Sequence, residues 1–135
     1  MTGYKIGIRK NEYSDKYDYC LIELKIPVGA KTVKAKGSFK YRCNKAYVKR
    51  IQVLNLKPVN DVIGWVCFGI KFEYKDVDEA ESWIHREDIP TKYRVGEMVY
   101  ADKFSKNKDK ECAGGIHFFA DDQTALMFLL SNYGH

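Results

Sequence analysis

Alternating apolar and polar residues recur along this chain at the period of two that is typical of β-strands. In YKIGIR, the residues Tyr4, Ile6 and Ile8 fall on one face. In YDYCLIELKIP, a second apolar set ends before Pro27 and comprises Cys20, Ile22, Leu24 and Ile26. Further strands are predicted at AYVKRIQVL, WVCFGIKFEY, YRVGEMVYAD (interrupted at Gly96) and GIHFF, with AKTVKAKG as an irregular or edge strand. So many strand-like segments predict a fold built on a β-sheet.

Two segments are predicted to be helical. The first is residues 76–88, DVDEAESWIHRED, whose acidic first turn suits a helix N-terminus. The second follows Asp121 or Asp122 as the N-cap and is apolar almost all round, which predicts that it is buried, with Gly134 as its C-cap.

With 135 residues, of which 45% are hydrophobic, the chain can build a core without disulfides. We therefore expect a single α+β domain over residues 1–135. It should have about six or seven mostly antiparallel strands and a buried C-terminal helix.

Several classes of protein are not expected. No apolar stretch is long enough to span a membrane, and MTGYKIGIRK lacks the apolar region of a secretory signal, so a cytoplasmic location is predicted. The cysteines contain no Cys-x-x-Cys pair, which argues against a zinc site and favours free thiols: they are Cys20, Cys43, Cys67 and Cys112. No cofactor is expected.

The charge is distributed unevenly along the chain, which has a net charge of +5. Residues 31–50 hold eight Lys or Arg and no acid, whereas residues 71–90 hold seven acids against three bases. The basic segment also contains Phe39, Tyr41 and Tyr47. Cations interleaved with aromatic rings can bind single-stranded nucleic acid, but a charged run is also typical of a solvated strand face. An acidic segment docking on another subunit's basic face, or edge strands pairing, would give a homodimer.

The segment ECAGGIHFF, residues 111–119, allows four interpretations. Cys112 and His117 could form a nucleophile and its base, or half of a metal site, if the glycines between them fold back. Gly114 and Gly115 could cradle a phosphate. Alternatively, the glycines form only a tight turn into a buried strand.

Three segments together resemble a small domain of unassigned function found in phage and giant-virus proteins, often attached to pentapeptide repeats. They are CLIELKIPVGAKTVKAKGSFKYRCNKAYVKRIQVL, YRVGEMVYADKF and ECAGGIHFFADDQTAL. The resemblance runs from about Tyr19 to Leu130, and its most specific part is the Cys-x-x-Gly-Ile-His-Phe-Phe motif. It implies a phage-type protein in the host cytoplasm, for which interference with a host pathway is one expected role.

The same motif is also similar, more loosely, to the strand and helix that line the nicotinamide pocket of ADP-ribosyltransferase-like domains. This similarity implies that His117 stands at the strand aromatic and Phe128 at the stacking tyrosine. Lys5 or Arg9 would approach the ribose. No acidic residue follows Asp122 to serve as the late catalytic glutamate, so the similarity implies a nucleotide pocket rather than transfer.

The sequence thus predicts a non-catalytic binding module whose ligand is a nucleotide-like anion or a host protein. An NAD-using ADP-ribosyltransferase-like enzyme and a nucleic-acid-binding protein acting through residues 31–50 are the alternatives. The predicted ligand-binding residues are Gly114, Gly115, His117, Phe128, Arg9, Lys40 and Arg42.

Overall fold

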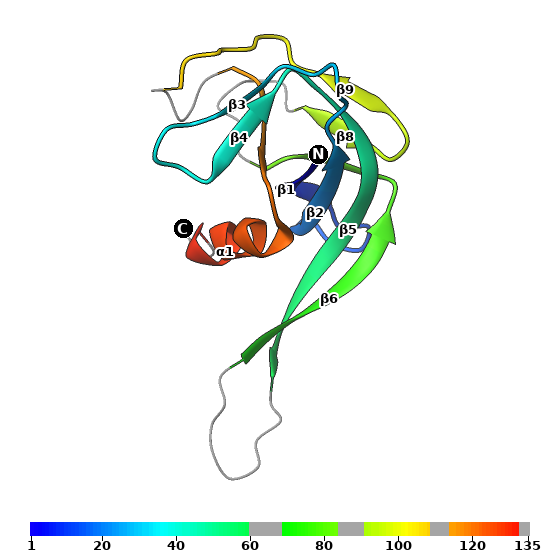
Figure 1. Cartoon of the computed structure of the whole chain (residues 1–135). Helices are drawn as coiled ribbons and strands as arrows, with labels where there is room; N and C mark the ends of the chain where they lie inside the picture. Colours follow the sequence, from blue (N-terminus) through cyan, green and yellow to red (C-terminus); the bar gives the residue numbers. More distant parts are fainter. Residues whose placement is uncertain (60–68, 84–90, 109–113, 133–135) are drawn as a thin grey trace.

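The computed structural model describes residues 1–59, 69–83, 91–108 and 114–132. These residues form ten strands and one helix: β1 (Thr2–Lys10), β2 (Tyr17–Lys25), β3 (Thr32–Lys34), β4 (Lys40–Cys43), β5 (Lys45–Val59), β6 (Gly69–Val77), β7 (Glu79–Ser82), β8 (Lys92–Arg94), β9 (Met98–Tyr100), β10 (Ile116–Phe119) and α1 (Asp122–Asn132). The strands pair antiparallel in one strongly curled sheet with the shape of a half-barrel (Figure 1). The predicted strand-rich α+β architecture with a C-terminal helix is therefore confirmed.

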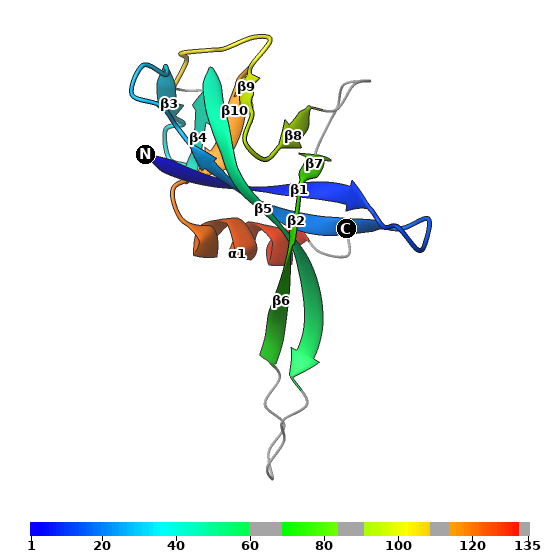
Figure 2. The ribbon, with the colours of Figure 1, turned by 90° about the vertical axis from the view of Figure 1, so that its right-hand side faces the viewer.

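Two strands of the curled sheet each have two neighbours along one edge. The main order is β3-β4-β10-β1-β2-β5-β6. One edge of β1 pairs with β10 at Tyr4 and with β7 at Gly7 and Ile8. The outer edge of β5 pairs first with β9 and then with β6, and the β5–β6 pair extends away from the rest of the sheet (Figure 2).

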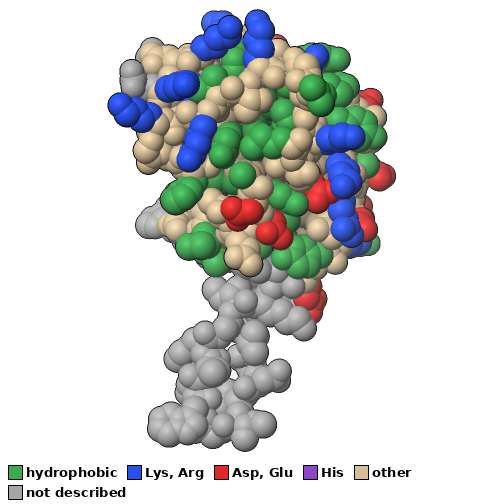
Figure 3. Space-filling view, viewed as in Figure 1, with side chains coloured by type: hydrophobic (Ala, Val, Ile, Leu, Met, Phe, Trp, Pro, Cys, Tyr) green, Lys and Arg blue, Asp and Glu red, His purple; other side chains and the backbone are tan. Residues whose placement is uncertain are grey.

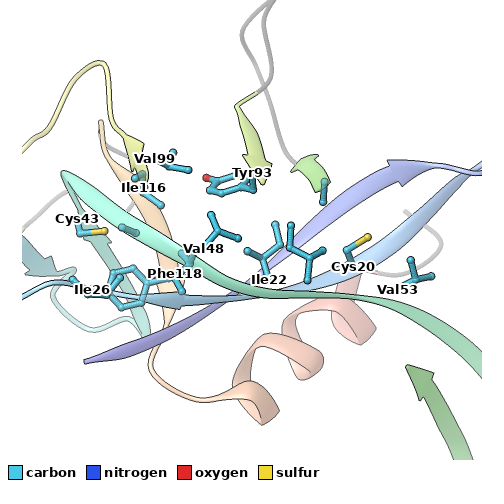
Figure 4. Close-up of a cluster of buried hydrophobic side chains, with 14 residues drawn as sticks. Cys20, Ile22, Ile26, Cys43, Val48, Val53, Tyr93, Val99, Ile116 and Phe118 are labelled. Carbon is cyan, nitrogen blue, oxygen red and sulfur yellow. The ribbon is translucent and has the colours of Figure 1, made fainter. Parts of the chain in front are cut away.

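Side chains on the two faces of the sheet enter two separate cores. The larger core lies inside the curl, where β8, β9 and β10 face β2 and β5 (Figure 4). Its members include the predicted set Cys20, Ile22, Leu24 and Ile26. The smaller core lies under α1 and contains Ile6, Leu21, Leu54, Phe119, Ala125 and Leu129. The period of two thus assigned this set of β2 to one face correctly.

The phase of β5 changes at a β-bulge. Glu23 pairs with Arg50, whereas the next residue, Leu24, pairs with Val48, so Lys49 is the extra residue. As a consequence Val48 is fully buried, while Tyr47, which an unbroken alternation places in the core with Ile51, is 38% exposed. A single-residue insertion of this kind leaves no clear signal in the sequence.

The predicted helix over residues 76–88 is wrong in its described part. β6 continues to Val77, and β7 is a strand that pairs with β1 on one side and β8 on the other. Gly7 permits this pairing, because a Cβ atom there would lie 2.6 Å from the carbonyl oxygen of Glu81. Pairing on both edges outweighs the local helical preference. Residues 84–88 lie outside the described residues.

The helix α1 begins as predicted but is less buried than predicted. Asp121 is the N-cap: its carboxylate accepts a hydrogen bond of 2.7 Å from the backbone N–H of Thr124, and this bond lowers the pKa of Asp121. Only Ala125 and Leu129 are buried, while Met127 is 67% exposed. The helix rests on one face of the sheet, so its outer side stays in contact with solvent. The predicted cap Gly134 lies outside the described residues.

The remaining strand predictions hold with changes of detail. The segment around Gly96 (φ +88°) forms two short strands, but β8 pairs with β7 and β9 with β5, so they are not a hairpin. β3 is an edge strand, as expected. β6 begins at Gly69, and residues 65–68 of that predicted strand lie outside the described residues.

Candidate functional site

The pairing of β10 with β4 brings several of the predicted residues together. His117 lies opposite Arg42, and Phe119 lies opposite Lys40. Directly opposed residues of an antiparallel pair point to the same side. Phe119 belongs to the core under α1, so all four side chains lie on the helix-covered face of the sheet.

Phe128 reaches the same face from α1. Its ring lies 5.3 Å from that of Phe119 and 5.7 Å from that of Trp83. The Nζ atom of Lys40 lies 5.3 Å from the centre of the Phe128 ring, a distance at which a cation is attracted to an aromatic face. The ring that the resemblance assigns to ligand stacking therefore packs against the protein's own aromatic residues and one lysine.

Arg42 is buried, with only 1% of its surface exposed. Its Nε donates a hydrogen bond of 2.8 Å to the carbonyl oxygen of Ser105, and its Nη2 donates to the carbonyl oxygen of Asn107. A buried guanidinium needs such partners, because an unpaired buried charge is strongly unfavourable. Arg42 thus fastens the loop 103–108 onto β4 and is not available on the surface.

Gly114 and Gly115 adjoin the same loop. The N–H of Ser105 donates to the carbonyl oxygen of Gly114 at 2.9 Å. A Cβ atom on Gly114 would lie 2.9 Å from the carbonyl oxygen of Lys103, and one on Gly115 would lie 3.1 Å from Cβ of Arg42. The space beside both glycines is therefore filled by the chain itself, which fits the interpretation of a tight turn into a buried strand.

Replacing Gly115 by Ala is expected to destabilise the protein by roughly 1–3 kcal/mol, because its φ of +141° is strained for alanine and the new methyl group is crowded. Gly37 offers a comparison without the crowding: its φ is also positive, at +71°, and nothing lies within 4 Å of its Cβ position. Denaturant unfolding of Gly115→Ala and Gly37→Ala compares the two. Equal losses of stability would mean that the close packing at Gly115 contributes nothing.

The other two predicted basic residues do not join this cluster. Arg9 lies on the opposite face of the sheet, pairs with Glu12 at 3.3 Å, and lines a small hollow with Asp18 and Lys75. Lys5 points into the larger core, where its Nζ donates a hydrogen bond of 2.8 Å to the hydroxyl of the buried Tyr93.

A hollow of about 280 Å³ lies beside the N-terminus of α1. Its lining comes from four strands and the helix, and consists of Tyr4, Leu21, Glu23, Arg50, Gln52, Tyr74 and Asp122. Burial, followed by the negative charge of Glu23, raises the pKa of Tyr4. Sequence reasoning missed this hollow because its lining residues are scattered along the chain.

The loop 103–108 adds a second group of lysines to the basic segment. The N–H of Lys36 donates to the carbonyl oxygen of Lys108 at 2.8 Å, which joins the β3–β4 turn to the loop. We call the combined surface the lysine corner; it comprises Lys31, Lys34, Lys36, Lys40, Lys103, Lys106 and Lys108. Lys40 is half-buried and the other six are exposed. Residues 31–43 and 103–108 contain no acid, although Asp102 and Asp109 flank the loop in the sequence. Basic side chains gather over β3, β4 and this loop in Figure 3.

Aromatic side chains accompany the lysines. Phe39, in the turn between β3 and β4, is 75% exposed. That turn is held by hydrogen bonds from Ala35 N to the carbonyl oxygen of Lys40 and from Lys40 N to the Ser38 hydroxyl. The Nζ of Lys34 lies 5.9 Å from the centre of the Tyr41 ring. The corner therefore offers cations and an exposed ring on an ordered turn.

The described cysteines are not positioned for chemistry. Burial raises the pKa of Cys20 to about 12 and that of Cys43 to about 11, so both stay protonated thiols at neutral pH. Cys112, the partner proposed for His117, and Cys67 lie outside the described residues. Within the described ranges, no group of three His, Cys, Asp or Glu side chains is arranged to hold a metal ion.

Comparison with known proteins gives a match to a protein family. Residues 66–125 match a family described as "Family of unknown function (DUF5758)". No curated protein and no solved structure matches the chain. Among the described residues, no helix has the length and apolar character required to cross a membrane. Residues 66–125 include the loop 103–108 and β10 but not β3 and β4, so the match covers one of the two segments that form the lysine corner.

Proposed function

We propose that this protein is a non-catalytic binding module whose lysine corner binds single-stranded nucleic acid. The observation that carries the proposal is the pair of hydrogen bonds from Arg42 to Ser105 and Asn107. Through them, two lysine-rich segments far apart in sequence form one surface. A buried residue that assembles a positive surface is a stronger indication of function than a basic run alone.

Electrostatics supports a polyanionic ligand. Lysines concentrated on one part of a surface attract phosphates, and each neutralised phosphate releases a counterion. Four ion pairs lie away from the corner, between Arg9 and Glu12, Lys49 and Glu23, Arg50 and Asp76, and Arg94 and Glu79. The hollows at Tyr4 and at Arg9 lie outside the corner, and the proposed ligand extends along the lysines of the corner itself.

The exposed ring of Phe39 favours nucleic acid over other polyanions. Bases stack on exposed aromatic side chains, and each stacking contact contributes about 1–3 kcal/mol. A sulfated polysaccharide has charge but no flat ring to stack. The implied phage origin, and the implied role in interfering with a host, come from the resemblance alone, and the proposal does not depend on them.

The test compares two ligands and one variant. A labelled single-stranded oligonucleotide and heparin are titrated with the unmodified protein and with Phe39→Ala. We expect Phe39→Ala to lower the affinity for the oligonucleotide by roughly fivefold or more, and to leave the affinity for heparin unchanged. If both proteins bind the oligonucleotide with equal affinity, Phe39 does not stack on its bases. If the protein binds heparin but not the oligonucleotide, its ligand is a polyanion other than nucleic acid.

A further inference from the structure

A second group of exposed aromatic side chains lies where β5 pairs with β9. Tyr47 lies opposite Met98, and Lys45 lies opposite Tyr100. The residues that alternate with them on both strands belong to the larger core, so these four side chains point to the other face of the sheet. We call the surface made by Lys45, Tyr47, Met98 and Tyr100 the tyrosine face.

The two rings of the tyrosine face are accessible and close together. Tyr100 is 65% exposed and Tyr47 is 38% exposed. Tyr47 points outward because the β-bulge at Lys49 shifts the alternation of β5 by one residue, and bulges are a common means of re-aiming a side chain. Diagonal neighbours on an antiparallel pair lie about 7–8 Å apart, which is roughly twice the 3.4 Å per nucleotide of a duplex strand. One extended single strand can therefore reach both rings.

The tyrosine face adjoins the lysine corner. The side-chain oxygen of Asn44 accepts a hydrogen bond of 2.8 Å from the N–H of Lys31, and its carbonyl oxygen accepts one of 2.9 Å from the N–H of Ala101. Asn44 directly precedes Lys45, and Ala101 directly follows Tyr100. From the end of β9 the chain continues into the lysine-rich loop of the corner, which leads over to β3 and β4 (Figure 1). The two surfaces therefore meet at Asn44.

We propose that a bound single strand continues from the lysine corner onto the tyrosine face, where its bases stack on Tyr47 and Tyr100. This inference rests on the proposed function of the corner and extends its binding surface. Exposed rings beside cations are the combination that holds single-stranded nucleic acid with little sequence preference. The ligand would thus contact Phe39 at one end of the surface and the two tyrosines at the other.

The charges around the tyrosine face indicate that stacking contributes most of its affinity. Lys45 lies on this face beside both rings, and Lys31 lies at the junction with the corner. Glu97 and Asp102, however, flank β9 in the sequence. The tyrosine face is therefore less positive than the corner, and its contribution to binding should depend little on salt.

The test measures the binding of a labelled single-stranded oligonucleotide of about 15 nucleotides, a length within the range of known single-strand sites. Tyr47→Ala and Tyr100→Ala should each raise its dissociation constant roughly fivefold. The slope of log K against log salt should stay the same, because neither side chain carries a charge. Tyr47→Phe and Tyr100→Phe keep the rings and should bind like the unmodified protein. An oligonucleotide of equal length without bases should bind all these proteins equally.

Tyr13→Ala provides the control, because Tyr13 is 92% exposed but lies in the turn between β1 and β2, beyond the end of β2 that pairs with β5 at Tyr47. It should leave the affinity unchanged. If Phe39→Ala weakens binding but Tyr47→Ala and Tyr100→Ala do not, the inference is wrong and the proposed function stands. Equal weakening toward the oligonucleotide without bases would also overturn the inference. If the unmodified protein binds no oligonucleotide, both proposals fail.

Discussion

Replacing Lys34, Lys36 and Lys106 together by glutamate is expected to lower the affinity for a single-stranded oligonucleotide by roughly a hundredfold or more. All three side chains are exposed and come from both segments of the lysine corner. Reversing their charges leaves about three phosphates without a cation and adds repulsion. The dependence of log K on log salt should then become shallower by roughly two, since each phosphate neutralised on a single strand accounts for about 0.7 of the slope. Fluorescence anisotropy at several salt concentrations measures both effects.

A matched control separates the corner from net charge. The variant K10E/K25E/K92E makes the same change in total charge at exposed positions on β1, β2 and β8. It should reduce affinity far less than the corner variant does, because long-range repulsion is screened at physiological salt. Equal reductions in the two variants would mean that the protein attracts the ligand through its overall charge and has no dedicated surface.

Replacing Arg42 by Ala is expected to lower both stability and ligand affinity, although Arg42 is buried. The change leaves the carbonyl oxygens of Ser105 and Asn107 without this donor and opens a cavity beneath the loop. We expect a loss of about 3 kcal/mol, and a fall in melting temperature of roughly 10 °C. Without this side chain the loop is joined to the β3–β4 turn by the Lys36–Lys108 hydrogen bond and no longer to β4 through Arg42, so its lysines should be held less firmly beside Lys34 and Lys36.

Arg42→Lys serves as the companion variant. It keeps the positive charge but cannot reproduce the forked pair of hydrogen bonds, so it should show an intermediate loss of stability. Thermal unfolding and anisotropy on the same preparations give the comparison. A fully stable Arg42→Ala protein with weakened affinity would show that Arg42 contacts the ligand directly. If Arg42→Ala changes neither stability nor affinity, Arg42 does not hold the loop 103–108 on β4.

The sequence predicted the central strands well because their pattern has a direct physical cause. One face of β2 is buried inside the curl, so Cys20, Ile22 and Leu24 alternate with residues of the other face. The prediction failed where a non-local contact decided the structure. The segment containing Ala80 has an acidic start suited to a helix, yet it is held as a strand between β1 and β8.

The candidate site was only partly predictable for the same reason. The sequence identified the basic segment 31–50 and a separate lysine-rich loop, but not that the two meet. Their contact depends on the buried geometry of Arg42, which in the sequence resembles one more surface cation. The only sign of a shared surface in the sequence is that both segments are rich in lysine. The glycines at 114–115 also gave a clear pattern, but only the structure shows that the chain's own loop fills the space beside them.

The most direct test of the central claim is the affinity of the unmodified protein for a single-stranded oligonucleotide across a range of salt concentrations. If the lysine corner binds the phosphate backbone, affinity should fall steeply as salt rises, with a log–log slope of roughly −3 for four or five neutralised phosphates. A flat salt response, or no binding even at low salt, would contradict the account.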